Sequence, residues 1–114
     1  MGKTLAEKIL AYCTEDKVKA GNIITAKVDV AMMDDILGPR YVGRELEKLN
    51  RRINDPSKLV VISDHYAPSG TIEQADIVAF TRDWAEKNNI QNYYEGIGPC
   101  HQILAENGYS VPGT

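Results

Sequence analysis

The chain has 114 residues, of which 43% are hydrophobic and 25% charged, and its formal net charge is −3. This length fits a single domain, residues 1–114, and the composition is ordinary for a globular protein. A weakly acidic chain lacks the basic surface that nucleic-acid binding requires, and no apolar run approaches the roughly 20 residues of a membrane-spanning helix. Glu7 and Lys8 would interrupt the apolar core of a signal peptide. We therefore expect a cytoplasmic protein that binds neither nucleic acid nor membrane.

The first third of the chain is predicted to form a helix and a strand. Thr4 and Glu7 make a capping box, and apolar residues at helical spacing behind it predict a helix of about ten residues. Cys13 is then a small buried apolar side chain on this helix. Residues 23–30 are β-branched and partly alternating, which predicts a strand. Residues 31–37 fit either a continuation of this strand or a helical turn.

A second helix and a second strand follow. Gly38-Pro39 interrupts the chain, and residues 40–52 are good helix formers with three apolar side chains on one face: Val42, Leu46 and Leu49. The continuous apolar run 59–62 predicts a strand that is covered on both faces.

The C-terminal part repeats the pattern. Thr71 and Gln74 form a second capping box, which opens a helix over 71–88 whose apolar positions follow helical spacing: Ile77, Phe80 and Trp84. Residues 91–95 predict a short strand, and residues 100–106 a last helix. The resulting alternation of helices and strands predicts an α/β fold of three layers (αβα) with a mainly parallel sheet.

Two short motifs contain both histidines of the chain. Asp64 and His65 follow the apolar run 59–62, and functional groups of open α/β sheets gather at such strand ends. A neighbouring aspartate favours the charged imidazolium, which is a competent general acid near neutral pH. The simpler alternative is a solvated loop in which Asp64 caps a turn. His101 lies at the start of the last predicted helix. A helix N-terminus favours anionic groups, so His101 could lie beside a substrate carboxylate. The simpler alternative is an ordinary surface histidine.

Together the motifs indicate a family. Ser63-Asp64-His65-Tyr66 and Gly98-Pro99-Cys100-His101-Gln102, followed by Val111-Pro112-Gly113-Thr114, resemble the opening of the large subunit of aconitase-type hydro-lyases. The similarity is closest to the branch that holds 3-isopropylmalate dehydratase, homoaconitase and dimethylmalate dehydratase. It covers essentially the whole chain and implies part of an aconitase-type domain.

The resemblance also implies roles for individual residues. His65 would protonate the departing hydroxyl group of a hydroxy acid, and Asp64 would hold it in the charged form. His101 would orient the substrate or act as an acid on it, and Tyr66 and Gln102 would contact the substrate. The loop after His65 looks nearer to the isopropylmalate or homoaconitate type than to aconitase.

The same family uses a [4Fe-4S] cluster, whose one iron without a cysteine ligand acts on the substrate. Cys13 and Cys100 are too few to hold such a cluster, and the resemblance places its three cysteines beyond Thr114. We therefore expect no metal ligands here and no activity of the isolated chain. The remainder of the large subunit and a small subunit would be its partners, and an exposed apolar face could lead to self-association.

Two other interpretations remain open. The chain could be a free-standing α/β binding module that keeps the fold without catalysis. It could also be a small metal-dependent enzyme whose ligands are His65, His101 and carboxylates such as Asp64.

Overall fold

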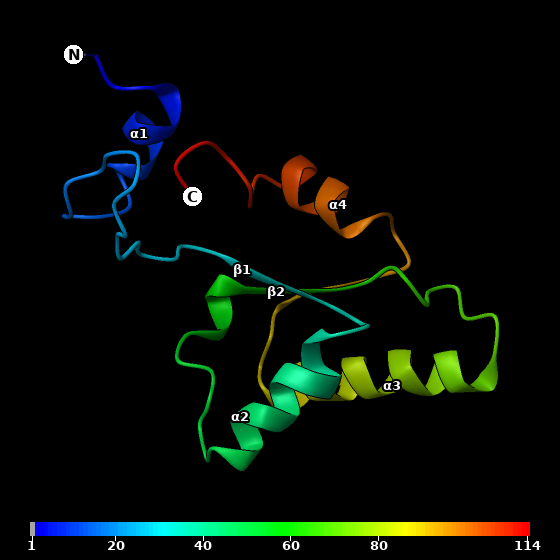
Figure 1. Ribbon diagram of the computed structural model, residues 1–114. Coiled ribbons are helices and arrows are strands. Elements are labelled where there is room, and N and C mark those ends of the chain that lie inside the picture. The colour runs from blue at the N-terminus through cyan, green and yellow to red at the C-terminus, as the bar shows by residue number, and fades with distance from the viewer. Residues whose placement is uncertain (1) are drawn as a thin grey trace.

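A three-stranded parallel sheet forms the centre of the computed structural model, which describes residues 2–114 (Figure 1). The strands are β1 (Ala31–Asp34), β2 (Leu59–Ser63) and β3 (Asn92–Glu95). Their order in the sheet follows the chain, β1-β2-β3, with Asp34 opposite Ile62 and Ser63 opposite Glu95. All three strands therefore end at the same edge of the sheet.

Helices cover both faces of this sheet. In chain order they are α1 (Leu5–Leu10), the π-helical turn η1 (Gly38–Gly43), α2 (Arg44–Lys48), the 3-10 turn η2 (Pro56–Lys58), α3 (Ile72–Lys87) and α4 (Cys100–Glu106). In Figure 1, α2 and α3 lie on one side of β1 and β2, and α4 lies on the other. The predicted α/β fold with three layers is confirmed.

The core is divided between the two faces because successive side chains of a strand point to opposite sides. One cluster packs β2 against α3 and against Ile90, three residues beyond its end: Leu59, Val61, Trp84, Ala85 and Ile90. The other packs β2 against α4: Val60, Ile62, Cys100 and Ile103. The whole of β2 is buried, as expected for a central parallel strand.

Most elements of the C-terminal half agree with the predictions. The strands predicted at 59–62 and 91–95 and the helices predicted at 71–88 and 100–106 are all present. Thr71 caps α3, since its hydroxyl accepts a hydrogen bond from the amide of Gln74 at 3.2 Å. The Gln74 side chain accepts from the amide of Gly70 rather than from Thr71, so only half of the predicted capping box forms.

The strand predicted over residues 23–30 is wrong. These residues have no regular structure, and the strand lies at Ala31–Asp34, in the stretch that the sequence left ambiguous. Ile23 is fully exposed and Val28 is 65% exposed. Strand propensity largely reflects packing against neighbours, and within residues 2–114 these side chains have no core to pack against.

The helix predicted over residues 40–52 is shorter and begins earlier. Gly38-Pro39 starts the helical turn instead of interrupting it, because proline at the first positions of a helix loses no hydrogen bond. The predicted apolar face is not the buried one, since Val42 and Leu49 are exposed. This segment contacts α3 through Gly43 instead, where a Cβ would lie only 2.6 Å from Nε1 of Trp84.

Two further details differ from the predictions. The first helix has six residues rather than about ten, although its capping box between Thr4 and Glu7 is complete. Cys13 therefore lies beyond the helix, half-buried, with its thiol donating to the carbonyl of Gly113 at 3.4 Å. On α3 the predicted face is partly wrong: Trp84 is buried and Ile77 half-buried, but Phe80 is exposed, and the buried residues are Val78, Thr81, Trp84 and Ala85.

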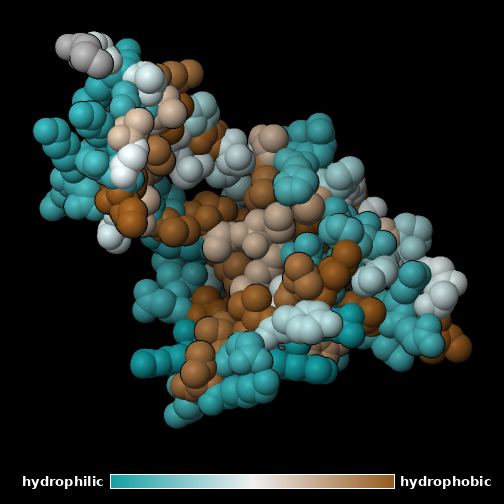
Figure 2. All heavy atoms as spheres, in the orientation of Figure 1, coloured by the Kyte–Doolittle hydropathy of each residue, from teal (hydrophilic) through white to brown (hydrophobic). Residues whose placement is uncertain are grey.

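Residues 2–30 form an N-terminal arm that extends from the sheet. The radius of gyration is 16.8 Å, whereas a compact chain of this length has about 13 Å. The arm lies beside the C-terminus (Figure 1), and Figure 2 shows hydrophobic surface in brown among polar surface on it. Its exposed large side chains of apolar character are Leu5, Leu10, Tyr12, Ile23 and Val28. Self-association through such residues stays a prediction. Within residues 2–114, no helix combines the length and the apolar character needed to cross a membrane.

The stability of the fold should depend on β2 and not on the arm. Ile62 is 1% exposed and Ile23 is 100% exposed. Ile62→Ala should lower the free energy of unfolding by about 2–5 kcal/mol because it leaves a cavity in the core. Ile23→Ala, the matched control, should change it by less than about 0.5 kcal/mol. Urea unfolding followed by circular dichroism measures both, and equal effects of the two variants would contradict the assignment of the core.

Candidate active site

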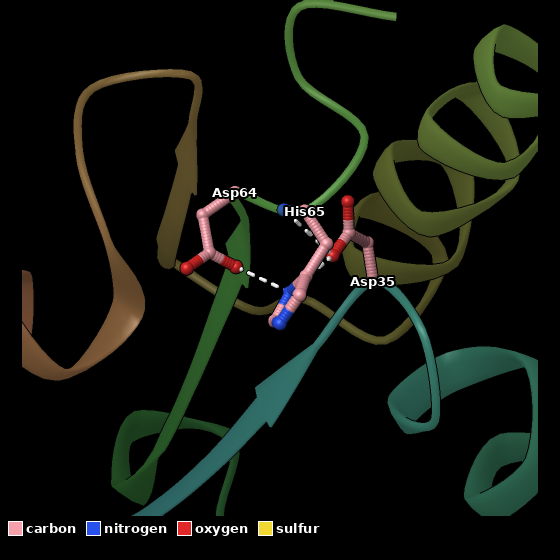
Figure 3. Close-up of side chains that lie close together, drawn as sticks. All are labelled: Asp35, Asp64 and His65. Atoms are coloured by element: carbon pink, nitrogen blue, oxygen red, sulfur yellow. Dashed lines mark hydrogen bonds and ion pairs between the residues drawn. The ribbon is translucent and has the colours of Figure 1, made fainter.

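Polar side chains gather at the edge where the strands end. Asp35 directly follows β1, and Asp64 and His65 directly follow β2. Because β1 and β2 are parallel and adjacent, these two strand ends lie side by side. Figure 3 shows the three side chains converging there, with the imidazole of His65 in contact with both carboxylates.

Asp64 connects the two histidine motifs. One of its carboxylate oxygens, Oδ1, lies 2.8 Å from Nδ1 of His65, and the other, Oδ2, accepts a hydrogen bond from the backbone amide of Cys100 at 2.6 Å. Cys100 is the first residue of α4, so the carboxylate also satisfies one of the free amides at the start of that helix. The Asp64 side chain is only 11% exposed. The predicted Asp–His pair is therefore formed, and it is attached to the helix that carries His101.

Asp35 is the residue that sequence reasoning missed. Its side chain is fully buried and accepts from the backbone amides of His65, at 3.3 Å, and Tyr66, at 3.0 Å. Its Oδ1 also lies 3.2 Å from Nδ1 of His65. Its position just after a strand would have been the signal, but the strand had been predicted to lie at 23–30.

The surroundings of His65 favour its charged form. Burial by itself lowers the pKa of the imidazole, but the charge of Asp64 and the hydrogen bond to Asp35 outweigh it, so the pKa of His65 is raised. Oδ1 of Asp64 is enclosed, and its contact with the ring has the distance of an ion pair without the alignment of a hydrogen bond. A positive imidazolium is therefore the group that best compensates this buried carboxylate. Both contacts are to Nδ1, which leaves Nε2 on the far side of the ring from the carboxylates (Figure 3).

The other predicted site residues lie less close together. His101 and Gln102 are exposed on the first turn of α4, and Gln102 donates to Glu106 at 2.6 Å. Among the contacts of the described residues, none joins the His101 ring to Asp64 or His65. Tyr66 is half-buried beside them, held through its backbone amide. The structure thus unites Asp64 and His65 and places His101 and Gln102 on the adjoining helix.

A hydrogen-bonded network supports the strand ends on the α3 side. The hydroxyl groups of buried Ser63 and of Tyr93 are 3.2 Å apart, and Tyr93 donates to Glu95 at 2.6 Å. Arg82 of α3 holds the same glutamate with two hydrogen bonds of 2.7 and 3.0 Å. Burial and the neighbouring carboxylate raise the pKa of Tyr93 to about 12, so this hydroxyl remains a donor. The network attaches α3 to the end of β3 beneath the site.

The cysteines do not suit an iron–sulfur cluster. Cluster ligands are thiolates, and a [4Fe-4S] cluster usually takes four. Cys100 is buried, and burial together with Asp64 raises the pKa of its thiol. Cys13 lies on the N-terminal arm and bonds to the carbonyl of Gly113. These two residues therefore do not form a cluster site.

A site for a single metal ion would not use the ligands expected from the sequence, which were His65, His101 and carboxylates such as Asp64. Asp35, Asp64 and His65 each place one possible ligand atom within 4.8 Å of the others, whereas His101 is not in this group. Both oxygens of Asp35 already accept hydrogen bonds from backbone amides. Two hollows of the surface lie away from this group: one of about 550 Å³ is on the N-terminal arm, and one of about 600 Å³ is beside α2. The geometry is that of an oriented imidazole rather than of a metal cage.

The charge of His65 can be tested by NMR titration of its ring. The midpoint should lie above about 6.5, the ordinary value of an imidazole. Asp64→Asn should lower this midpoint, because it removes the largest contribution that favours the cation. Asp83→Asn, on the exposed side of α3, is the matched control and should leave it unchanged. His101→Gln identifies the signals of the second ring, and a midpoint below about 6.5 in the parent chain would disprove the assignment.

The same shift makes stability depend on pH. Because folding raises the pKa of His65, the stabilisation it provides is complete below about pH 6.5 and is lost as the pH rises through the folded-state pKa. The difference in urea midpoint between the parent chain and His65→Gln should therefore shrink between about pH 6 and about pH 9. A difference that grows with pH would contradict a raised pKa.

Comparison with known proteins identifies relatives of the chain. The chain is 43% identical over 114 residues to 3-isopropylmalate dehydratase large subunit 1 of Methanopyrus kandleri, a match that covers 99% of this chain and 27% of that protein. It is 44% identical over 115 residues to the probable 3-isopropylmalate dehydratase large subunit of Methanothermobacter thermautotrophicus, with the same coverage. The homoaconitase large subunit of Thermus thermophilus is 35% identical over 113 residues. No protein-family model matches the chain.

The chain thus spans about a quarter of the length of these relatives. The matches confirm the resemblance that the two histidine motifs indicated. Over almost its whole length, the chain is a homologue of the N-terminal part of aconitase-type hydro-lyase large subunits, in the branch of 3-isopropylmalate dehydratase and homoaconitase.

Proposed function

We propose that this chain forms one wall of the active site of a hydro-lyase that acts on a hydroxy di- or tricarboxylic acid such as 3-isopropylmalate. The observation that carries the proposal is the imidazole of His65, held at Nδ1 by two carboxylates with Nε2 free. A general acid needs a charged imidazolium with one exposed N–H, and the raised pKa of His65 supports this form near neutral pH.

In the proposed reaction His65 donates the proton from Nε2 to the hydroxyl group of the substrate. The C–O bond breaks and the hydroxyl leaves as water. The electron pair of the neighbouring C–H bond forms the new double bond, and its proton passes to a base outside this chain. Asp64 keeps the ring charged before the transfer and lies next to the neutral ring afterwards. The reverse sequence hydrates the double bond, so the same residues serve dehydration and isomerisation.

We propose that His101 and Gln102 on α4, and Tyr66 in the loop after β2, bind the substrate. His101 and Gln102 are exposed on the first turn of α4, which Asp64 holds beside His65. Exposed imidazole and amide groups suit a substrate carboxylate or hydroxyl. Tyr66, anchored next to His65 by its amide, would contact the substrate from the other side.

The complete enzyme is proposed to use a [4Fe-4S] cluster held by cysteines that are not part of this chain. When bound, such a cluster supplies a Lewis acid for the substrate hydroxyl and carboxylate. The residues described above do not hold the cluster; they donate a proton to the substrate and orient it. The proposed partners are the remainder of a large subunit and a small subunit, in agreement with relatives that are named as large subunits.

The proposal predicts activity only in the assembled enzyme. The chain should be assayed with the remainder of a related large subunit and a small subunit supplied in trans, on 3-isopropylmalate, homocitrate and dimethylmalate. One of these acids should be turned over, and His65→Gln should lower kcat by about 10²–10⁴-fold because it removes the general acid. His101→Gln should act mainly on KM. Circular dichroism serves as the control for folding.

Two outcomes would contradict the proposal. If the assembly with the parent chain turns over none of the three acids, the chain is better described as a binding module. If it is active and His65→Gln retains the parent kcat, His65 is not the acid.

A second prediction concerns the isolated chain. Reconstitution with iron and sulfide under reducing conditions should give no visible absorbance of a cluster, because Cys13 and Cys100 do not form a cluster site. The parent chain and a Cys13→Ser, Cys100→Ser double variant should have the same spectrum. A stable chromophore that the double variant lacks would show that these cysteines bind a cluster after all.

A further inference from the structure

Asp35 is the only ionisable side chain within residues 2–114 that is fully buried. An enclosed carboxylate is costly unless hydrogen bonds compensate it. All of its hydrogen bonds go to one dipeptide on the neighbouring strand end: the amide of His65, the amide of Tyr66 and Nδ1 of His65. A buried charge devoted to two consecutive residues indicates a role in holding them.

The position of Asp35 follows from the register of the sheet. Asp34 lies opposite Ile62 in the parallel pair of β1 and β2, so Asp35 stands where β2 gives way to the loop. Its two oxygens accept from successive amides of that loop, which directs the backbone of His65 over the strand end. The contact to Nδ1 then restricts the rotation of the ring. Backbone and ring are thus held by the same carboxylate.

Asp64 cannot do this alone. Its Oδ2 is committed to the amide of Cys100, and only Oδ1 faces the ring. The His65 side chain is 39% exposed, so a single contact would leave the imidazole free to turn toward solvent. A second carboxylate on the other side of Nδ1 removes this freedom.

We propose that Asp35 is a positioning residue for His65: it holds the loop backbone and the imidazole so that Nε2 faces the substrate. The inference rests on the proposed function, since it assigns a direction to the acid named there. Asp64 would then mainly favour the charged form of His65 and join α4 to the site, while Asp35 would orient the His65 ring. Asp35 touches no part of the open side of the site, because it is fully buried.

The alternative is that Asp35 merely anchors the loop. An anchor would affect folding and the protection of the Tyr66 amide, but it would leave the tautomer of the neutral His65 ring and the balance of kcat and KM unchanged. The other titratable groups near the ring are Asp64 and Asp34, whose charges raise its pKa, and the Cys100 thiol, which faces Asp64 from α4.

The test uses Asp35→Asn and Asp35→Glu in the full chain, with Asp55→Asn as matched control. Asp55 also accepts a backbone amide in a turn, from Ser57 at 3.1 Å, but this turn lies at the opposite end of β2 from the site. In the assembled enzyme, Asp35→Asn should lower kcat about 100-fold through misplacement of the acid, with KM almost unchanged. The alkaline limb of its pH profile should move to lower pH, because one carboxylate that favours the imidazolium is gone. Asp35→Glu should recover part of kcat, and Asp55→Asn should behave like the parent.

NMR of the chain alone separates this inference from the proposed function. In the parent, the neutral His65 ring should carry its proton on Nδ1, and Asp35→Asn should lower the midpoint and mix the two tautomers. If Asp35→Asn does not fold, Asp35→Glu is measured in the same way, and a shifted tautomer ratio supports the role. Parent-like titration, tautomer and kcat in the folded variants would overturn it. An inactive parent assembly would overturn the proposed function alone, because the NMR result still decides whether Asp35 holds the ring.

Discussion

The arrangement of this site depends on the two contacts that the carboxylate of Asp64 makes. With one oxygen it faces His65, and with the other it accepts the first amide of α4. The two segments are 36 residues apart along the chain, and each begins where a strand has just ended. One carboxylate thus makes the largest contribution to the charged form of the imidazole and also holds the helix that carries His101. Loss of this acceptor would leave the first amide of α4 without its partner and would remove one of the two carboxylates beside the ring.

The sheet makes that interaction possible. Parallel strands deliver their ends to one edge, and the fully buried β2 cannot shift without exposing apolar side chains on both faces. Val61 packs toward α3, and Val60 and Ile62 pack toward α4. Rigid layers on both sides hold the loop that follows β2, so that Asp35 can reach it from the adjacent strand. The polar groups at this edge are costly to bury. Asp35 and Oδ2 of Asp64 accept hydrogen bonds from neighbouring segments, and Oδ1 of Asp64 forms an ion pair with His65.

Much of the fold could be predicted from local patterns. Continuous apolar residues predicted β2, and the threonine cap at Thr71 predicted the start of α3, because both features depend on residues close in sequence. The failures have a common cause. Residues 23–30 have strand propensity but pair with no strand in the described part of the chain, and η1 packs against Trp84 through Gly43, which has no side chain to reveal the contact. Strand propensity and hydrophobic periodicity are properties of one segment, whereas packing also depends on the segment that it contacts.

The candidate site divides in the same way. The sequence by itself determined the pair Asp64-His65, the second motif around His101 and the family they indicate, because neighbours in a short motif need no fold to be recognised. Only the tertiary structure decided that Asp64 joins the two motifs and that Asp35 is the second carboxylate of His65. Asp35 lies 30 residues before His65, and nothing in its local sequence distinguishes it from the exposed aspartates of the chain. The register of two parallel strands brings it to the ring, and that register is set by the packing of the whole sheet.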